Sequence, residues 1–431
     1  MQMMTGKEME GLTKKIGLIG LIASGIGMIL GAGIYALIGS AAGISGNSVW
    51  LSFLLGAFIS SFTGISYAEL SSAIPKSAAE YFYVKEAFSN RLLPSIIGYV
   101  IIFTEIFAAS TVAMGFAGYL TGLLGYPIVL TSLVLIVTLS FLNFVGIQES
   151  SRLNIIFTLI EVSGLILIVV LAIPFLGTVN YFEMPNGFQG ILKASILIFF
   201  AYLGFEDIVN ISEEAKNPER DVPKALIISV IITAIIYFIV AIATVSLADW
   251  QELGTTSSPL AFAASKAIGQ KAFFVLSIIA LFATSNTVLI LLIVTSRMIY
   301  GMARDKALPV SLSKISKRGT PWVAILLTMI LSSLFIFLGN IEFVAEITNF
   351  GTFIIFISVN LSAILLRYRK PNLRGKFRTP FTIGKIPVFP LIGLLSSGLL
   401  ITQFNVNVIA FGLVMIFFAI VLATAINRNK K

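Results

Sequence analysis

The stretch "GMILGAGIYAL", Gly27 to Leu37, places Gly31, Ala32 and Gly33 at the centre of the first long apolar run of the chain. Glycine weakens a helix because it loses more conformational freedom than any other residue when the helix forms. Glycines also let two membrane helices pack closely, and Gly27 with Gly31 has the spacing of such a contact. The stretch alone therefore has two interpretations: a packing surface, or a helix that is interrupted within a membrane.

The composition of the chain is that of an all-α integral membrane protein. Of 431 residues, 57% are hydrophobic and 11% are charged, whereas soluble domains have about 25% charged residues. The mean hydropathy is +0.99. Helices satisfy every backbone polar group within a bilayer, and hydropathy predicts about twelve of them. The predicted spans are 16–38, 49–73, 93–123, 127–146, 152–177, 188–211, 224–247, 272–301, 321–338, 342–367, 386–404 and 407–427.

The net charge of +9 arises from basic residues in the loops, and we predict no nucleic-acid partner from it. Basic residues gather on alternate loops, most densely in "RYRKPNLRGKFR", Arg367 to Arg378, whereas the opposite side keeps little beyond Lys193, Lys266 and Lys271. This bias predicts a multi-pass protein of the cell (plasma) membrane with both termini in the cytoplasm. The alternative for the first apolar run is a cleaved signal peptide, but the run is longer than a typical signal core.

The chain contains no cysteine and no histidine. Disulfides, thiol chemistry, histidine metal sites and histidine-based catalysis are therefore excluded. The sequence shows no glycine-rich phosphate loop, no paired-carboxylate metal motif and no soluble domain between the predicted spans. We expect neither an enzyme nor a bound cofactor or metal.

The sixth predicted span also contains an interruption. In "FFAYLGFEDIVN", Phe199 to Asn210, Gly204 is followed by Glu206 and Asp207. A carboxylate at that depth is costly unless it faces a polar cavity or a partner. Transporters built from two inverted five-helix repeats interrupt the first helix of each repeat at the membrane midplane, where half-helix ends bind charged groups. Spans one and six are five apart, as that architecture requires.

This architecture predicts the following division of the chain. A cytoplasmic tail covers 1–15, the first repeat 16–177, the second, inverted repeat 188–367, two further helices 386–427, and a second tail 428–431.

Five stretches resemble the amino acid, polyamine and organocation (APC) transporter family, and the resemblance covers nearly the whole chain. It implies a leucine-transporter-type fold and a secondary active transporter that imports amino acids by alternating access, without covalent chemistry. The stretches are "ILGAGIYAL" in span one, "YAELSSAIPKSAAEYFYV" (67–84), "FFAYLGFEDIVNISEEAKNPERDVPKAL" (199–226), "SRMIYGMARDKALP" (296–309) and "LRYRKPNLRGKFRTP" (366–380).

The resemblance also implies where a substrate binds. In the family, the α-carboxylate lies near the span-one glycines and the amino group lies near backbone carbonyls of the span-six break. An aromatic residue four positions before the span-six glycine gates the pocket. Phe200 has that place here, with packing in the core or against lipid as its alternative role. The implied substrate-binding residues are Ile29, Gly31, Ala32, Gly33, Phe199, Phe200, Ala201, Leu203 and Gly204.

Three membrane carboxylates are candidates for proton coupling. Glu206 matches a glutamate linked to proton exchange in some family members, and its structural alternative is to cap unwound backbone. Glu105, on span three, is frequent in the family and could be structural. Glu161 stands where some members carry a lysine in place of a sodium ion. It could exchange a proton, or it could bind sodium together with Thr284 and Ser285.

Substrate and coupling stay open at this point. Small and apolar residues at the two breaks favour a neutral amino acid, whereas Glu206 or Glu105 would favour a cationic amino acid or a polyamine if it faced the substrate. Proton coupling is the first hypothesis, and sodium coupling, amino acid exchange, a channel and a receptor are alternatives. Glu69 and Glu80 are predicted to position the inner loop. Spans eleven and twelve could support a homo-oligomer.

Overall fold

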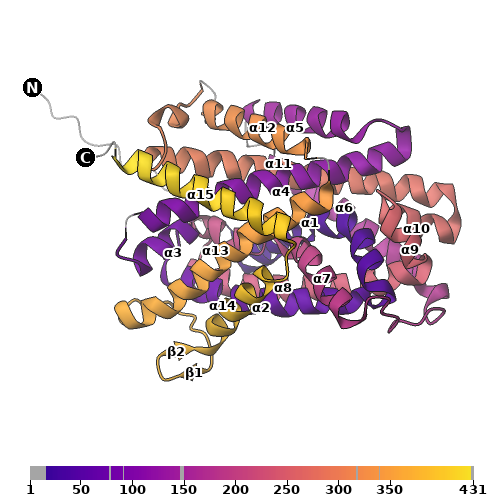
Figure 1. Cartoon of the computed structure of the whole chain (residues 1–431), viewed down its shortest axis with the longest axis horizontal. Helices are drawn as coiled ribbons and strands as arrows, with labels where there is room; N and C mark the ends of the chain where they lie inside the picture. The colour runs from indigo at the N-terminus through magenta and orange to yellow at the C-terminus, as the bar shows by residue number, and fades with distance from the viewer. Residues whose placement is uncertain are drawn as a thin grey trace, which may run out of the picture.

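The computed structural model describes residues 16–428 except 77–78, 91, 146–149, 317–318 and 339. The predicted tail 1–15 and residues 429–431 of the predicted tail 428–431 lie outside the described residues. The described chain is almost entirely helical and forms one elongated bundle (Figure 1). Its small antiparallel hairpin pairs β1 (Thr382–Ile383) with β2 (Ile386–Pro387).

The helices follow the apolar runs of the sequence. Those of the first half are α1 (Leu18–Ser45), α2 (Val49–Ala73), α3 (Ala79–Ala87), α4 (Leu92–Leu124), α5 (Ile128–Val145) and α6 (Ser150–Ala172), with short 3-10 helices η1 (Gly46–Ser48) and η2 (Ile173–Phe175). Those of the second half are α7 (Gly187–Ile198), η3 (Phe199–Tyr202), η4 (Glu206–Glu214), α8 (Pro218–Leu247), α9 (Trp250–Thr255), α10 (Pro259–Ile268), α11 (Gln270–Arg304), η5 (Val310–Ser313), α12 (Trp322–Ile336) and α13 (Ile341–Arg369). The last two are α14 (Val388–Ile401) and α15 (Val406–Arg428).

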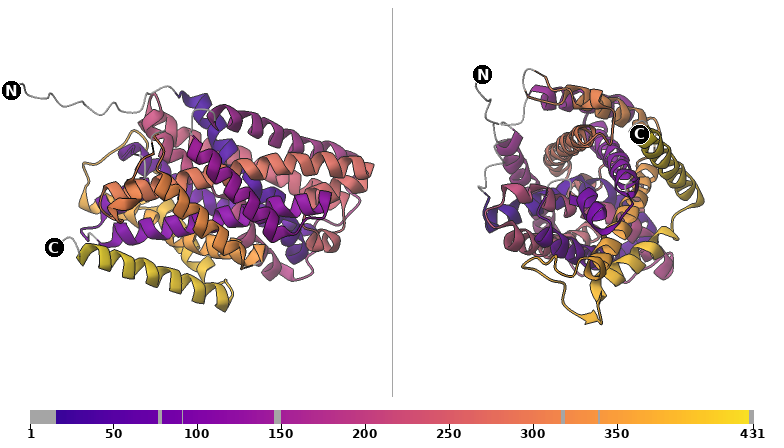
Figure 2. Two further views of the ribbon diagram at one scale, coloured as in Figure 1. Left: turned by 90° about the horizontal axis from the view of Figure 1, so that it is seen from above. Right: turned by 90° about the vertical axis from the view of Figure 1, so that its left-hand side faces the viewer.

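Within the described ranges, nine helical segments are long and apolar enough to cross a membrane. The first of them, Leu18–Ala73, contains both α1 and α2, whereas α12 and α14 are apolar helices of 15 and 14 residues. The central helix α4 has 72% of its most apolar window buried, but α15 has only 22%. Figure 2 accordingly shows α15 along the outside of the bundle. The protein is an all-α membrane protein, and the twelve-span layout stays a prediction.

The two halves of the chain make matching contacts. α1 packs on α7, α2 on α8, α4 on α11 and α5 on α12. The contact of α1 with α8 has its counterpart in that of α7 with α2, and the contact of α4 with α13 has its counterpart in that of α11 with α6. The connections that correspond in the two halves, α3 and the pair α9 and α10, lie at opposite ends of the bundle (Figure 1).

A single backbone bridge joins the chain before α1 to the chain after η4. Ile16 pairs with Ala215 in the parallel sense, and the amide of Lys216 donates a hydrogen bond of 2.9 Å to the carbonyl of Ile16. The start of the first half is thereby attached to the end of the interrupted segment of the second half.

Candidate substrate site

Helix α1 is interrupted at Gly31. Its φ of −8° and ψ of −161° are not helical, and the helix resumes at Ala32 and continues to Ser45. The first amides of a helix have no carbonyl partner within it. The amide of Ala32 donates instead to Oγ1 of Thr287 on α11, at 3.2 Å. The positive end of a 14-residue half-helix therefore lies in the interior of the bundle.

The segment from α7 to η4 is interrupted beside it. α7 ends at Ile198 and continues as the 3-10 helix η3, and Gly204 has a φ of +107°, which favours glycine. A Cβ on Gly204 would lie 2.4 Å from the carbonyl oxygen of Met28. A Cβ on Gly33 would lie 2.4 Å from Cα of Ala201. Glycine at both positions allows the two interruptions to touch backbone to backbone.

Tyr237 of α8 links the two interruptions from behind. Its buried hydroxyl donates toward the carbonyl oxygen of Ile29 at 2.7 Å and toward that of Ala201 at 2.9 Å. Ile29 precedes the break in α1, and Ala201 lies in η3. The hydroxyl of Tyr237 is thus within hydrogen-bonding distance of one carbonyl on each interrupted segment. It fixes the position of the two segments relative to each other.

A cavity of about 80 Å³ lies between the two breaks. A single water needs about 10–15 Å³ on this measure, so the cavity holds several waters or a small solute. Its lining is mostly apolar away from the breaks. The apolar side chains are Met28, Ile29, Ile101, Ala108, Val112, Phe200, Leu203, Ile290, Leu291, Val294, Met298, Ile355 and Phe356.

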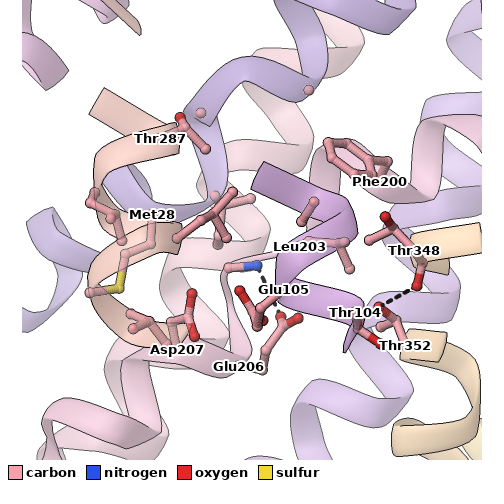
Figure 3. Close-up of a pocket in the computed structure, with 18 of the residues that line it drawn as sticks. Met28, Thr104, Glu105, Phe200, Leu203, Glu206, Asp207, Thr287, Thr348 and Thr352 are labelled. Atoms are coloured by element: carbon pink, nitrogen blue, oxygen red, sulfur yellow. Dashed lines mark hydrogen bonds between the residues drawn. The ribbon is translucent and has the colours of Figure 1, made fainter. Parts of the chain in front are cut away.

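Four carboxylates also line the cavity: Glu80, Glu105, Glu206 and Asp207. Among the described residues that line it, none is lysine or arginine. Figure 3 shows Glu105, Glu206 and Asp207 gathered at one side, with Phe200 and Thr287 away from them. The site is therefore polar and acidic at one side and apolar over much of the rest.

Glu206 and Glu80 lie in different surroundings. Oε2 of Glu206 accepts a hydrogen bond of 3.0 Å from the amide of Gly204, which corresponds to the capping role considered above. Glu80 comes from α3, outside the candidate membrane spans, and its side chain is buried. Burial, together with the smaller effect of the charge of Asp207, raises the pKa of Glu80 to about 7. Glu80 is therefore suited to exchanging a proton near neutral pH.

All but one of the substrate-binding residues implied by the resemblance line this cavity. They are Ile29, Gly31, Ala32, Gly33, Phe200, Ala201, Leu203 and Gly204. Phe199 lies outside the lining, fully buried, with its ring centroid 4.6 Å from that of Phe353. Successive residues of a 3-10 helix point about 120° apart. Phe199 therefore faces the core when Phe200 faces the cavity.

The candidate coupling and ion residues lie in two places. Glu105 and Glu206 line the cavity, whereas Glu161 is buried in α6 outside it. Oε1 of Glu161 accepts no hydrogen bond within the described part of the chain. Thr284 and Ser285 also lie outside the lining, and their hydroxyls donate to the carbonyls of Ala280 and Leu281, both at 2.6 Å. A sodium site at Glu161, Thr284 and Ser285 stays a prediction.

Sequence reasoning missed several polar residues of the cavity. Thr287 lines it, whereas Thr284 and Ser285 on the same helix were considered only for an ion site, and Asp207 lines it next to Glu206. Glu80 was expected only to position the inner loop, yet it reaches the cavity from α3. The sequence did contain a signal for Asp207, because it directly follows Glu206, which was already a candidate site residue. Glu69 was expected to position the same inner loop, but the contacts of its carboxylate are to Arg367 and to the amide of Thr379, so it holds the segment that follows α13.

Comparison with known proteins shows the family of the chain. The family model described as "Amino acid permease" matches residues 16–428, and the chain belongs to that family. It is 29% identical to the branched-chain amino acid permease BcaP of Bacillus subtilis, over 90% of this chain and 87% of the relative. It is 28% identical to the methylthioribose transporter of the same organism, over 89% of this chain and 87% of the relative. It is also 28% identical to the vacuolar cationic amino acid transporter 4 of Arabidopsis thaliana, over 84% and 64%.

Proposed function

We propose that this permease imports neutral, apolar amino acids by alternating access and couples their entry to protons. The observation that carries the proposal is the contact of two interrupted helices around a cavity that is apolar on one side and acidic on the other. Transporters place their substrates at such interruptions. The relatives named as permeases and transporters support transport rather than catalysis as the role of the site.

The α-carboxylate of the substrate binds at the break in α1. The positive end of the half-helix Ala32–Ser45 and the amides at Ala32 and Gly33 supply donors without a side chain in the way. Thr287 accepts the Ala32 amide in the structure described here, so a bound carboxylate would take its place as acceptor. The ammonium group binds near the carbonyls of η3, and the side chain lies among the apolar residues beside Phe200.

The acidic side of the cavity carries the coupling. Glu206 touches the second break directly through its bond to Gly204. Protonation of Glu206 would weaken that bond, because a neutral carboxyl is a poorer acceptor than a carboxylate, and would so change the break next to the substrate. Glu80 faces the same cavity from α3 and offers the next site for the proton on the way to that end of the bundle. Glu161 is a candidate for the coupling proton because it is a buried membrane carboxylate. It ranks second because it lies in α6 apart from the cavity.

Matching contacts between the two halves support the inverted repeats 16–177 and 188–367. Each of the first four spans packs on its counterpart, and the corresponding connections lie at opposite ends of the bundle. In the mechanism we propose, the first two helices of each repeat rock against the others. The side of α3 is then the cytoplasmic side, since the inner loops are the basic ones.

A cationic amino acid is the second candidate substrate. The specific observation is the four carboxylates that line the cavity, without lysine or arginine among the described lining residues. A positively charged side chain would be stabilised beside Glu105 and Asp207, whereas in the first proposal protons neutralise part of this charge.

Uptake into proteoliposomes tests both candidates. The purified full-length protein is reconstituted, the outside is made one pH unit more acidic than the lumen, sodium is omitted, and labelled leucine and lysine are offered separately. We expect leucine to accumulate and a protonophore to abolish the accumulation. Uptake of lysine alone would establish the second candidate. Uptake only after the lumen is preloaded with amino acid would show an exchanger and contradict proton-driven import.

A further inference from the structure

A second cavity, of about 510 Å³, lies apart from the first at the end of the bundle that carries α3. Its walls are the ends of α2 and α13 and the segment 370–385, which includes part of the hairpin of β1 and β2. Neither the proposed transport cycle nor the central cavity uses these residues.

The lining of this cavity is strongly basic. It contains Arg367, Lys370, Arg374, Arg378 and Lys385, with Glu69 as its carboxylate. Two of the cations are compensated, because Arg367 pairs with Glu69 and Lys370 pairs with Glu86. In the described part of the chain, no carboxylate lies within ion-pair distance of Arg374, Arg378 or Lys385. Three exposed cations therefore share one concave surface without a counter-ion from the chain.

Arg367 adds a buried donor to this surface. Its side chain is 5% exposed, and it binds Glu69 through two hydrogen bonds, from Nε at 2.9 Å and from Nη2 at 2.6 Å. Its third nitrogen, Nη1, is buried and has no hydrogen-bond partner in the described chain. A buried guanidinium donor without an acceptor is costly. An acceptor beside Arg367 would lower this cost only once the groups that cover Nη1 move aside.

Apolar side chains flank the cations. Phe381 lines the cavity and is 73% exposed, and Ile383 of β1 is 70% exposed. The hairpin projects sideways beyond the helices rather than along the long axis of the bundle (Figure 2). Cations beside exposed apolar residues on the flank of a membrane bundle match the boundary between lipid head groups and acyl chains.

We propose that this cavity binds the phosphate of an anionic phospholipid, with Arg374, Arg378 and Lys385 facing the phosphate and Phe381 and Ile383 against the acyl chains. The positive-inside bias explains why this loop is basic, but it does not explain a concave surface with a buried, unpartnered donor. The exposed apolar residues favour a lipid over a soluble phosphate as the source of the anion.

Lipid retention by the full-length protein tests the proposal. The protein is exchanged into nanodiscs that contain equal amounts of phosphatidylglycerol and phosphatidylcholine, and bound lipid is measured by native mass spectrometry. The test variant replaces Arg374, Arg378 and Lys385 with Gln. The matched control replaces Lys216, Lys224 and Lys314, three exposed lysines assigned to the same side of the membrane, so both variants lose the same charge. Arg367 is left in place because its loss would leave Glu69 unpaired.

We expect the wild-type protein and the control to retain phosphatidylglycerol preferentially and the test variant to lose the preference. One cation near an anionic surface contributes about fivefold in affinity, so the loss should be at least tenfold. Equal retention by both triple variants would overturn the proposal, as would equal retention of the two lipids by the wild type. Displacement of phosphatidylglycerol by millimolar inorganic phosphate would assign the site to a soluble anion instead. Leucine uptake is measured separately, so a failure of the transport proposal would not affect this outcome.

Discussion

The two helix interruptions differ in what they present to the cavity. In α1, one residue, Gly31, leaves the helical conformation, and a regular half-helix of 14 residues begins at once. In the second half, the α-helix ends at Ile198, and the chain runs through two 3-10 helices, the second of which begins with Glu206 and Asp207. The first break thus offers backbone donors and the second offers carboxylates.

This difference suits a substrate that has charges of opposite sign at its two ends. A half-helix N-terminus stabilises an anion without adding a side chain, whereas a carboxylate stabilises a cation or carries a proton. Symmetric breaks would bind two like groups. The asymmetry also separates two tasks, since the α1 break positions the substrate and the acidic break can change charge during the cycle.

The largest expected effect comes from forcing the two breaks apart. In Gly33→Ala, the new Cβ meets the backbone of Ala201, which cannot move aside as a side chain could. Overpacking costs about 1–3 kcal/mol, so leucine uptake should fall by roughly one to two orders of magnitude. Gly301→Ala is the control, because a Cβ there meets nothing within 4 Å. Normal uptake by Gly33→Ala would show that the contact of the breaks is not required.

Charge at the second break is tested by comparing Glu206→Gln with Glu161→Gln. A difference of one pH unit can drive at most about tenfold accumulation per coupled proton. If Glu206 carries that proton, Glu206→Gln should reduce leucine accumulation to simple equilibration and leave exchange across preloaded vesicles measurable. Glu161→Gln should keep its dependence on the gradient. The reverse result would move the coupling from the second break to α6.

The link between the breaks is tested by Tyr237→Phe. This change removes the donor shared by the carbonyls of Ile29 and Ala201, and an unsatisfied buried acceptor costs about 1–3 kcal/mol. We expect lower thermal stability and a several-fold rise in the leucine KM. Tyr119→Phe is the matched control, since the hydroxyl of Tyr119 on α4 donates to the carbonyl of Tyr35 in the second half of α1 and does not join the two breaks. Equal KM values in both variants would make the link purely structural.

The smallest expected effect is on the pH dependence of protein stability that arises from Glu80, on the acidic side of the cavity. Its pKa of about 7 exceeds the ordinary value of 4.5, so between these pH values the folded protein retains a proton that the unfolded chain has lost. Stability therefore falls as the pH rises through this window and levels off above it. Glu80→Gln should remove this contribution, a change of a few degrees in Tm between pH 5 and pH 8. Glu342→Gln should retain it, and identical pH profiles in wild type and Glu80→Gln would contradict the assignment.

Hydropathy and glycines predicted the positions of the helices and of both breaks, because an apolar run and a glycine that weakens a helix are both visible in the local sequence. The register of α11 was not accessible in this way. Thr284, Ser285 and Thr287 differ only in which side of one apolar helix they occupy, and neighbouring helices decide that side. The contribution of Glu80 depends on α3 folding back to the cavity, and a helix of nine residues with weak hydropathy gives no sign of such a contact.

The bridge between Ile16 and Ala215 has a practical consequence. Neighbouring strands bring paired residues close enough for a disulfide, and the chain contains no other cysteine that could compete. A cysteine at each position would give a cross-link that forms on oxidation and opens on reduction. The bridge joins the start of α1 to the end of η4, so such a cross-link would reversibly prevent these two segments from moving apart. If transport stops on oxidation and resumes on reduction, the start of α1 and the end of η4 must separate during the transport cycle.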